Sequence, residues 1–124
     1  MRKIPDTLKN EILSDQFYTR CALAHCVGGC AGRVTWEHAI IFAGRQLNEK
    51  WAIVPLCELH HGVNSYQDVT APQKERSLWV AVNMATDAEL IAVSKAVDYR
   101  RERERLNAKY GNYSPYWCRA EQKE

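Results

Sequence analysis

The feature that most constrains this chain is a cluster of cysteines and histidines in its first half. The sequence has five cysteines and four histidines in 124 residues, and among these nine residues Cys118 alone lies outside positions 21–61. A chain of this length buries a modest core, so a bound metal ion would add useful stability. Cysteines interspersed with histidines favour a metal site. The competing interpretation, a disulfide-linked secreted domain, requires an oxidising compartment, and the first residues show no signal-peptide pattern.

One half of a zinc site is predicted by the spacing Cys57-x-x-His60. This spacing lets a turn entering a helix present a thiolate and an imidazole to one tetrahedral ion. The other half must come from upstream, where Cys21, Cys26 and Cys30 compete for two positions. We favour Cys21 and Cys30, with Cys26 as the alternative ligand. The ion in this site would be structural.

A second, chemically different set consists of Glu37, His38 and His61. His61 follows His60 directly, and neighbouring helical residues point about 100° apart, so His61 is available for a second ion. Glu37 and His38 end an expected strand, where adjacent side chains point to opposite faces. Glu37 can therefore hold a divalent ion while His38 stays metal-free and accepts a proton from water. Phosphodiester hydrolysis needs these parts.

Two segments combine an acidic-His pair, a spacer and a final His beside zinc ligands. They are Cys30-Ala-Gly-Arg-Val-Thr-Trp-Glu-His38 and Ala43-Gly-Arg-Gln-Leu-Asn-Glu-Lys-Trp-Ala-Ile-Val-Pro-Leu-Cys57-Glu-Leu-His-His61. The combination resembles the HNH nuclease family, in particular the small versions common in bacteriophage and prophage genomes. The resemblance covers about residues 17–66.

The resemblance implies an α+β fold with a ββα-metal core, or His-Me finger, in which two strands and a helix hold one catalytic divalent ion. Carried over by position, Glu37 and His61 become ligands of this ion and His38 becomes the general base. The ion would be Mg²⁺ or another divalent metal such as Mn²⁺ or Ni²⁺, separate from the structural Zn²⁺. The family commonly has Asp or His where Glu37 stands, and a glutamate still ligates metal.

The middle Asn of the family motif has no direct counterpart. It usually lies five residues before the zinc-ligand Cys, where this chain has Ala52. The nearest Asn is Asn48, which we expect to orient the His38 imidazole or to brace the strand pair. Asn64 lies three residues after His61 on the same expected helix face. It is a candidate extra ligand or phosphate contact, or else a polar residue at a helix end.

Strands and a short helix are expected around this motif. Segments 33–36, 39–42 and 51–56 are β-branched or apolar, and a polar loop separates the second from the third. Pro55 should end the last strand, because proline lacks the N–H that a sheet needs. A short helix over 57–66 then begins at the metal cluster.

Further helices are expected on both sides of the core. Asp6 or Thr7 can cap a first helix with Leu8, Ile12 and Leu13 on one face.

In the second half, capping-box patterns start two helices, one with Thr70 and Gln73 and one with Thr86 and Glu89. Helical spacing continues to Gly111, so the second of these helices should be the longest. We expect a single domain over residues 1–111, with the core at about 17–66, a helical extension at about 70–111 and a tail at 112–124.

The charge pattern is ambiguous about partners. The formal net charge is +2, and no apolar run approaches the ~20 residues of a membrane span. The stretch 95–109 carries six basic and three acidic residues, which favours a solvated face of mixed-sign pairs over a nucleic-acid contact. We expect a cytoplasmic protein without membrane contact, located in the bacterial host cell if it is phage-encoded.

The sequence thus predicts a metal-dependent endonuclease that hydrolyses DNA with His38 as general base. No second domain is expected, so cleavage should be weakly sequence-specific or directed by a partner such as a phage or host DNA-processing protein. The alternative is a non-catalytic zinc-stabilised module that binds nucleic acid or protein on an HNH scaffold.

Overall fold

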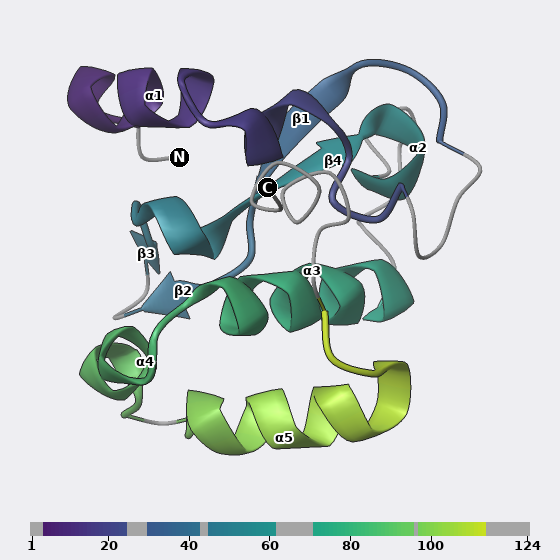
Figure 1. The fold of residues 1–124 in the computed structure, drawn as a ribbon. Coiled ribbons are helices and arrows are strands. Elements are labelled where there is room, and N and C mark those ends of the chain that lie inside the picture. Colours follow the sequence, from purple (N-terminus) through teal and green to yellow (C-terminus); the bar gives the residue numbers. More distant parts are fainter. Residues whose placement is uncertain (1–3, 25–29, 43–44, 62–70, 96, 114–124) are drawn as a thin grey trace, which may run out of the picture.

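The structure, a computed structural model, describes residues 4–24, 30–42, 45–61, 71–95 and 97–113. The fold is α+β, with short antiparallel strand pairs packed among helices (Figure 1). The helices are α1 (Asp6–Leu13), α2 (Glu58–His61), α3 (Ala71–Met84), α4 (Asp87–Val93) and α5 (Tyr99–Tyr110), with 3-10 turns η1 (Gln16–Thr19) and η2 (Lys50–Ala52). The strands are β1 (Val34–His38), β2 (Ile41–Phe42), β3 (Arg45–Gln46) and β4 (Ile53–Cys57).

The β1–β4 pair places a cysteine at one end and a histidine at the other. The strands run antiparallel, with Val34 opposite Cys57 and His38 opposite Ile53. Cys57 and His38 therefore lie at opposite ends of the pair, four residue steps or about 13 Å apart along the strands. α2 begins directly after Cys57 and contacts both strands. The elements β1, β4 and α2 thus follow one another in the order strand, strand, helix.

Pro55 lies inside β4 and not at its end, so that prediction was wrong. It stands opposite Trp36 in the pair. The carbonyl oxygens of Ile53 and Pro55 accept hydrogen bonds from the Tyr18 hydroxyl (2.8 Å) and the Ala22 amide (2.7 Å). This side of β4 therefore faces η1 and the loop after it, and proline is tolerated on a strand side that needs no ladder donor.

The strands also differ from the expected bounds. β1 begins one residue after the expected start at 33 and continues through Glu37 and His38, which places this pair inside the sheet. The expected strand at 39–42 shrinks to the two residues of β2, which pair with β3 as a short hairpin.

The long helix expected from 86 to 111 is two helices, α4 and α5, so three helices follow the core and not two. The Ser94 hydroxyl donates to the Leu90 carbonyl (2.7 Å) and accepts from the Tyr99 amide (3.1 Å). The Asp98 carboxylate then accepts from the first amides of α5 as its N-cap. Short polar side chains that bind nearby backbone groups compete with helical hydrogen bonds, which ends α4. α3, with 14 residues, is the longest helix of the described chain.

Helix ends and faces were predicted in part. The capping box of Thr86 and Glu89 is confirmed, and Gly111 ends α5 with a positive φ of 93°. At α1, the N-cap is Pro5 without a side-chain hydrogen bond, so neither Asp6 nor Thr7 caps that helix. Leu13 is 66% exposed and was wrongly placed on the packing face, because α1 ends there and the chain turns away. The capping pair expected at the start of α3 lies outside the described side chains.

The main core lies between the β1–β4 pair and α5, with α3 in the middle (Figure 1). The Trp79 indole N–H donates to the Gly111 carbonyl (2.8 Å), and its ring packs against Tyr113 at 5.1 Å. Tyr113 comes from the expected tail, yet it is buried and its hydroxyl donates to the Ala22 carbonyl (2.6 Å). This contact ties the end of the helical extension to the loop after Cys21. Among the described helices, none has the length and apolar character to cross a bilayer.

Candidate functional site

Three of the expected zinc ligands lie together. The Sγ atoms of Cys21, Cys30 and Cys57 are all within 4.8 Å of one another, although they come from a loop, a turn and the end of β4. In a regular tetrahedron with metal–sulfur bonds of about 2.3 Å, the sulfurs are separated by about 3.8 Å. The three cysteines are therefore placed as three corners of a site that could hold a metal such as zinc.

The surroundings of the cluster are suited to a closed structural site. Cys21 and Cys57 are buried and Cys30 is exposed. Burial raises the pKa of the Cys21 thiol, whereas the backbone amides of Cys57 and Leu23 point at its sulfur and lower the pKa. Partial burial of the Cys30 sulfur, together with the Cys21 thiol beside it, raises the pKa of Cys30 to about 12. Metal binding would therefore release protons from these thiols.

The loop that carries Cys21 is fixed from several sides. The Ala22 amide donates to the Pro55 carbonyl, and the Ala22 carbonyl accepts from Tyr113. Tyr18, three residues before Cys21, is hydrogen-bonded through its hydroxyl to the carbonyls of Lys50 and Ile53. Burial raises the pKa of this tyrosine, so it stays a neutral donor. These bonds hold the loop against β4.

The turn that carries Cys30 is fitted closely to the start of α2. Gly32 has a positive φ of 85°, and a Cβ built on it would lie 2.4 Å from Glu58 Oε1 and 2.8 Å from Glu58 Cβ. The Leu59 amide donates to the Ala31 carbonyl (3.2 Å), and the Arg33 guanidinium donates to Glu58 (3.3 Å). A glycine is required here because the segment after Cys30 runs directly against the residue after Cys57.

The side chain of His60, the predicted fourth zinc ligand, lies outside what the structure describes. The backbone of His60 lies in α2, three residues after Cys57. Cys26, the alternative ligand, is also outside the described residues.

At the other end of the β1–β4 pair, His38 and Asn48 form a second polar group. His38 Nε2 and Asn48 Oδ1 are 2.8 Å apart, and both residues are half-buried. An amide oxygen is an acceptor, so Nε2 is the ring nitrogen that donates in this contact. The expectation that Asn48 orients the His38 imidazole agrees with this contact.

Ala52, five residues before Cys57, leaves no room for a polar side chain. It is fully buried at the end of η2, and its carbonyl accepts the Ala39 amide (2.9 Å) next to His38. A polar side chain there would enter the core. Asn48 stands in the segment just before η2, at the surface side, and reaches the imidazole from there.

The structure describes the position of Glu37, whereas the side chain of His61 and all of Asn64 lie outside the described part. Glu37 lies in β1 opposite Val54, half-buried, and strand alternation directs its side chain to the face opposite to that of His38. His61 is the last described residue of α2.

Sequence reasoning did not anticipate two supports of the site. Tyr18 and Tyr113 hold the Cys21 loop from η1 and from beyond α5, and no spacing pattern signals such long-range contacts. The tight fit of Gly32 had a weak signal, because glycines near a cysteine pair favour sharp turns. Its contact with Glu58 depends on the tertiary fold.

Comparisons of the chain with protein-family models, with curated proteins and with solved structures gave no match. The chemistry of the residues themselves therefore carries the functional interpretation.

Proposed function

We propose that this protein is a metal-dependent endonuclease of the HNH type that hydrolyses phosphodiester bonds in DNA. The observation that carries the proposal is the contact between His38 Nε2 and Asn48 Oδ1 at the end of β1. It holds the His38 imidazole in one orientation, one residue after Glu37 in β1, and the β1–β4 pair leads from this end to the cysteine cluster at the other end.

His38 acts as the general base in this proposal. With its Nε2 proton held by Asn48, the Nδ1 lone pair accepts a proton from the attacking water. The water oxygen forms a bond to phosphorus while the bond from phosphorus to the leaving oxygen breaks. Asn48 keeps the ring in one orientation and one tautomer, so it is a positioning residue.

Glu37 and His61 are the residues that would hold the divalent ion. A bound Mg²⁺, Mn²⁺ or Ni²⁺ ion supplies Lewis-acid stabilisation of the negative charge that develops on the phosphate. Glu37 offers the oxygen ligand that hard cations prefer, and it directly precedes His38 in β1.

The cysteine cluster has a structural role in this proposal. Cys21, Cys30, Cys57 and His60 hold Zn²⁺, with Cys26 as the alternative to one of the upstream cysteines. The ion connects the Cys21 loop and the Cys30 turn to the end of β4, where α2 begins. It therefore sets the position from which α2 carries His61.

The proposal is tested by incubating purified, zinc-loaded protein with supercoiled plasmid and with branched DNA. Separate reactions contain Mg²⁺, Mn²⁺, Ni²⁺ or a chelator that leaves the zinc in place. The expected result is nicked or linear DNA with at least one of these ions and none with the chelator. Intact DNA under every metal condition would contradict the proposal. DNA binding without cleavage would instead support the non-catalytic zinc module.

A further inference from the structure

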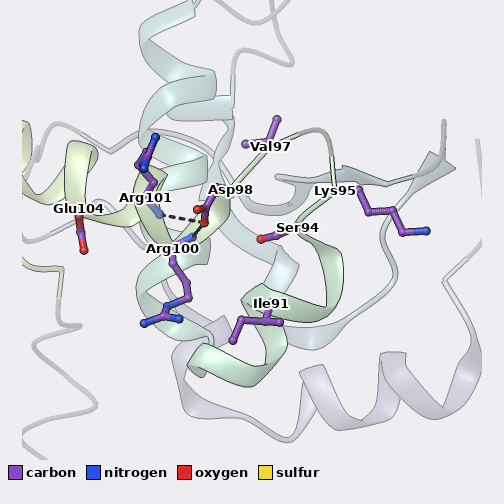
Figure 2. A pocket seen from close by; sticks show the side chains of 8 residues that line it. All are labelled: Ile91, Ser94, Lys95, Val97, Asp98, Arg100, Arg101 and Glu104. Atoms are coloured by element: carbon purple, nitrogen blue, oxygen red, sulfur yellow. Dashed lines mark hydrogen bonds between the residues drawn. The ribbon is translucent and has the colours of Figure 1, made fainter.

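A cavity of about 560 Å³ lies where α4 meets α5 (Figure 2), apart from the cysteine cluster. Three basic side chains line it, Lys95, Arg100 and Arg101, together with the exposed apolar side chains Ile91 and Val97. Figure 2 shows Lys95 and Arg100 on opposite sides of Ile91. The cavity is thus lined by both basic and apolar side chains.

The other basic residues of α5 are already neutralised by carboxylates. Arg103 pairs with Asp87 at 2.5 Å, Arg105 pairs with Glu102 at 2.7 Å and Glu75 at 3.3 Å, and Lys109 pairs with Glu75 at 2.7 Å. These contacts form the mixed-sign face expected for this stretch. They leave the charge of α5 unbalanced at its N-terminal end, where the cavity lies.

The basic residues of the cavity have few such partners. Arg100 is 3.8 Å from Asp87, a carboxylate whose other oxygen binds Arg103. Within the described part of the chain, Lys95 and Arg101 form no ion pair with any carboxylate. Three half-satisfied or unsatisfied cations around one hollow favour an anionic occupant.

The two acidic residues of the cavity lower its formal charge from +3 to +1 and leave it positive. Asp98 Oδ1 accepts hydrogen bonds from the amides of Arg100 (3.2 Å) and Arg101 (3.3 Å), so it serves as the N-cap of α5. Glu104 lies at the far end of the cavity from Lys95 (Figure 2). The region around Lys95 and Arg101 is therefore open to an anion.

The cavity is connected to the candidate catalytic end of β1 through Lys95. Lys95 Nζ lies 5.5 Å from the centre of the Phe42 ring, and Phe42 is four residues after His38. Four residues span at most about 14 Å of backbone, so Lys95 Nζ lies no farther than roughly 25 Å from the His38 backbone once the Phe42 side chain is included. Each DNA strand carries one phosphate per ~3.4 Å of helix axis, so this upper limit corresponds to about seven base pairs.

We propose that the cavity formed by Lys95, Arg100 and Arg101 binds the phosphate backbone of DNA beside the bond that is cleaved. The inference rests on the proposed nuclease function and names where the substrate is held. Lys95 and Arg101 contact phosphates a few base pairs from His38, while Ile91 and Val97 lie under the sugars. The contact is independent of sequence, because phosphates carry no sequence information.

The test is a binding titration followed by fluorescence anisotropy, with a labelled 24-base-pair duplex and no catalytic metal added. Lys95→Gln and Arg101→Gln each remove one charge from the cavity. Lys9→Gln removes one charge from an exposed position of α1 and is the matched control. Each cavity variant should bind about 5-fold to 10-fold more weakly near 0.1 M salt. The slope of the log binding constant against log salt concentration should become shallower by about 0.9 in each cavity variant. The Lys9→Gln control should keep the affinity and the salt slope of the wild type.

A cleavage assay on the same preparations separates this proposal from the nuclease proposal. Unchanged affinity and slope in both cavity variants, with wild-type cleavage intact, would overturn the cavity and leave the nuclease standing. Weakened binding as expected in a protein that cleaves no DNA would support phosphate binding by the cavity, but it would overturn the nuclease and with it the place of the cavity beside a cleaved bond. A wild-type protein that binds no duplex at all would overturn the cavity proposal.

Discussion

Replacing Gly32 by alanine should destabilise the fold and weaken zinc binding at the cysteine cluster. The effect should exceed that of an alanine at another glycine with a similar backbone conformation. Gly32 has a φ of 85°, and alanine in that region costs about 1–3 kcal/mol. The added Cβ would also meet Glu58 at 2.4 Å from Oε1 and 2.8 Å from Cβ. The carboxylate can swing away, but the Cβ moves only with its backbone, which adds about 1–3 kcal/mol. The total loss of stability is therefore about 2–6 kcal/mol.

Gly111→Ala is the matched control. Gly111 has a similar φ of 93°, but its added Cβ would meet nothing within 4 Å. Both variants share the backbone strain and the change in the unfolded chain, so their difference isolates the clash with Glu58. Thermal unfolding followed by circular dichroism should place the melting temperature of Gly32→Ala about 4–12 °C below that of Gly111→Ala.

Zinc affinity distinguishes a local effect on the cluster from general destabilisation. The clash pushes the Cys30 turn away from the residue after Cys57, so Gly32→Ala should bind zinc roughly 10-fold to 100-fold more weakly in competition with a chelator. Gly111→Ala should bind zinc like the wild type. Equal melting temperatures and equal zinc affinities in the two variants would refute the reasoning.

Three further predictions address separate contacts. Asn48→Ala should lower the rate of DNA cleavage about 10-fold to 100-fold without changing zinc content, and Asn48→Asp, which keeps the acceptor oxygen, should recover most of the rate. Tyr113→Phe leaves the buried Ala22 carbonyl without its donor, so urea denaturation should show a loss of about 1–3 kcal/mol, and an unchanged midpoint would contradict the contact. The hydrogen bond from Lys109 lowers the pKa of Glu75 to about 2 from an ordinary 4.5, so this carboxylate stabilises the fold above about pH 4.5 and loses that effect as the pH falls toward 2. The difference in unfolding free energy between wild type and Glu75→Gln should therefore be present near pH 6 and disappear by about pH 2; a difference independent of pH would contradict it.

The cysteine cluster was predictable because residue type and spacing along the sequence are enough to recognise metal ligands. Cys57 at the end of a strand and two cysteines in the upstream loop were enough to predict three corners of one site, and the structure brings Cys21, Cys30 and Cys57 together. The expectation for Asn48 came from proximity to His38 in the sequence, and the two side chains are in hydrogen-bond contact.

Contacts that depend on tertiary structure were not predictable. Pro55 is tolerated within β4 because Tyr18 and Ala22, and not a further strand, occupy that side. The apolar spacing in the sequence continues through Val97. The Ser94 hydroxyl nevertheless donates to the Leu90 carbonyl and accepts from the Tyr99 amide, and α4 ends there. In each case a single side chain or an unexpected neighbour outweighed the local pattern.

The second half of the chain shows the same limit. Its apolar spacing predicted helices, and α3, α4 and α5 are present. The pairing of charges between them was not predictable, because Glu75 of α3 and Asp87 of α4 neutralise arginines and a lysine of α5 only once the helices are packed. The cavity around Lys95 and Arg101 therefore became visible only in the structure.

The central claim is that His38 removes a proton from water during DNA cleavage. The most direct measurement is the initial rate of plasmid nicking by wild type and His38→Ala at equal zinc content, in the divalent metal that supports the highest activity. A general base contributes about 10²-fold to 10⁴-fold, so the variant should be slower by that factor while it binds DNA with the same affinity. Equal nicking rates in the two proteins would contradict the account.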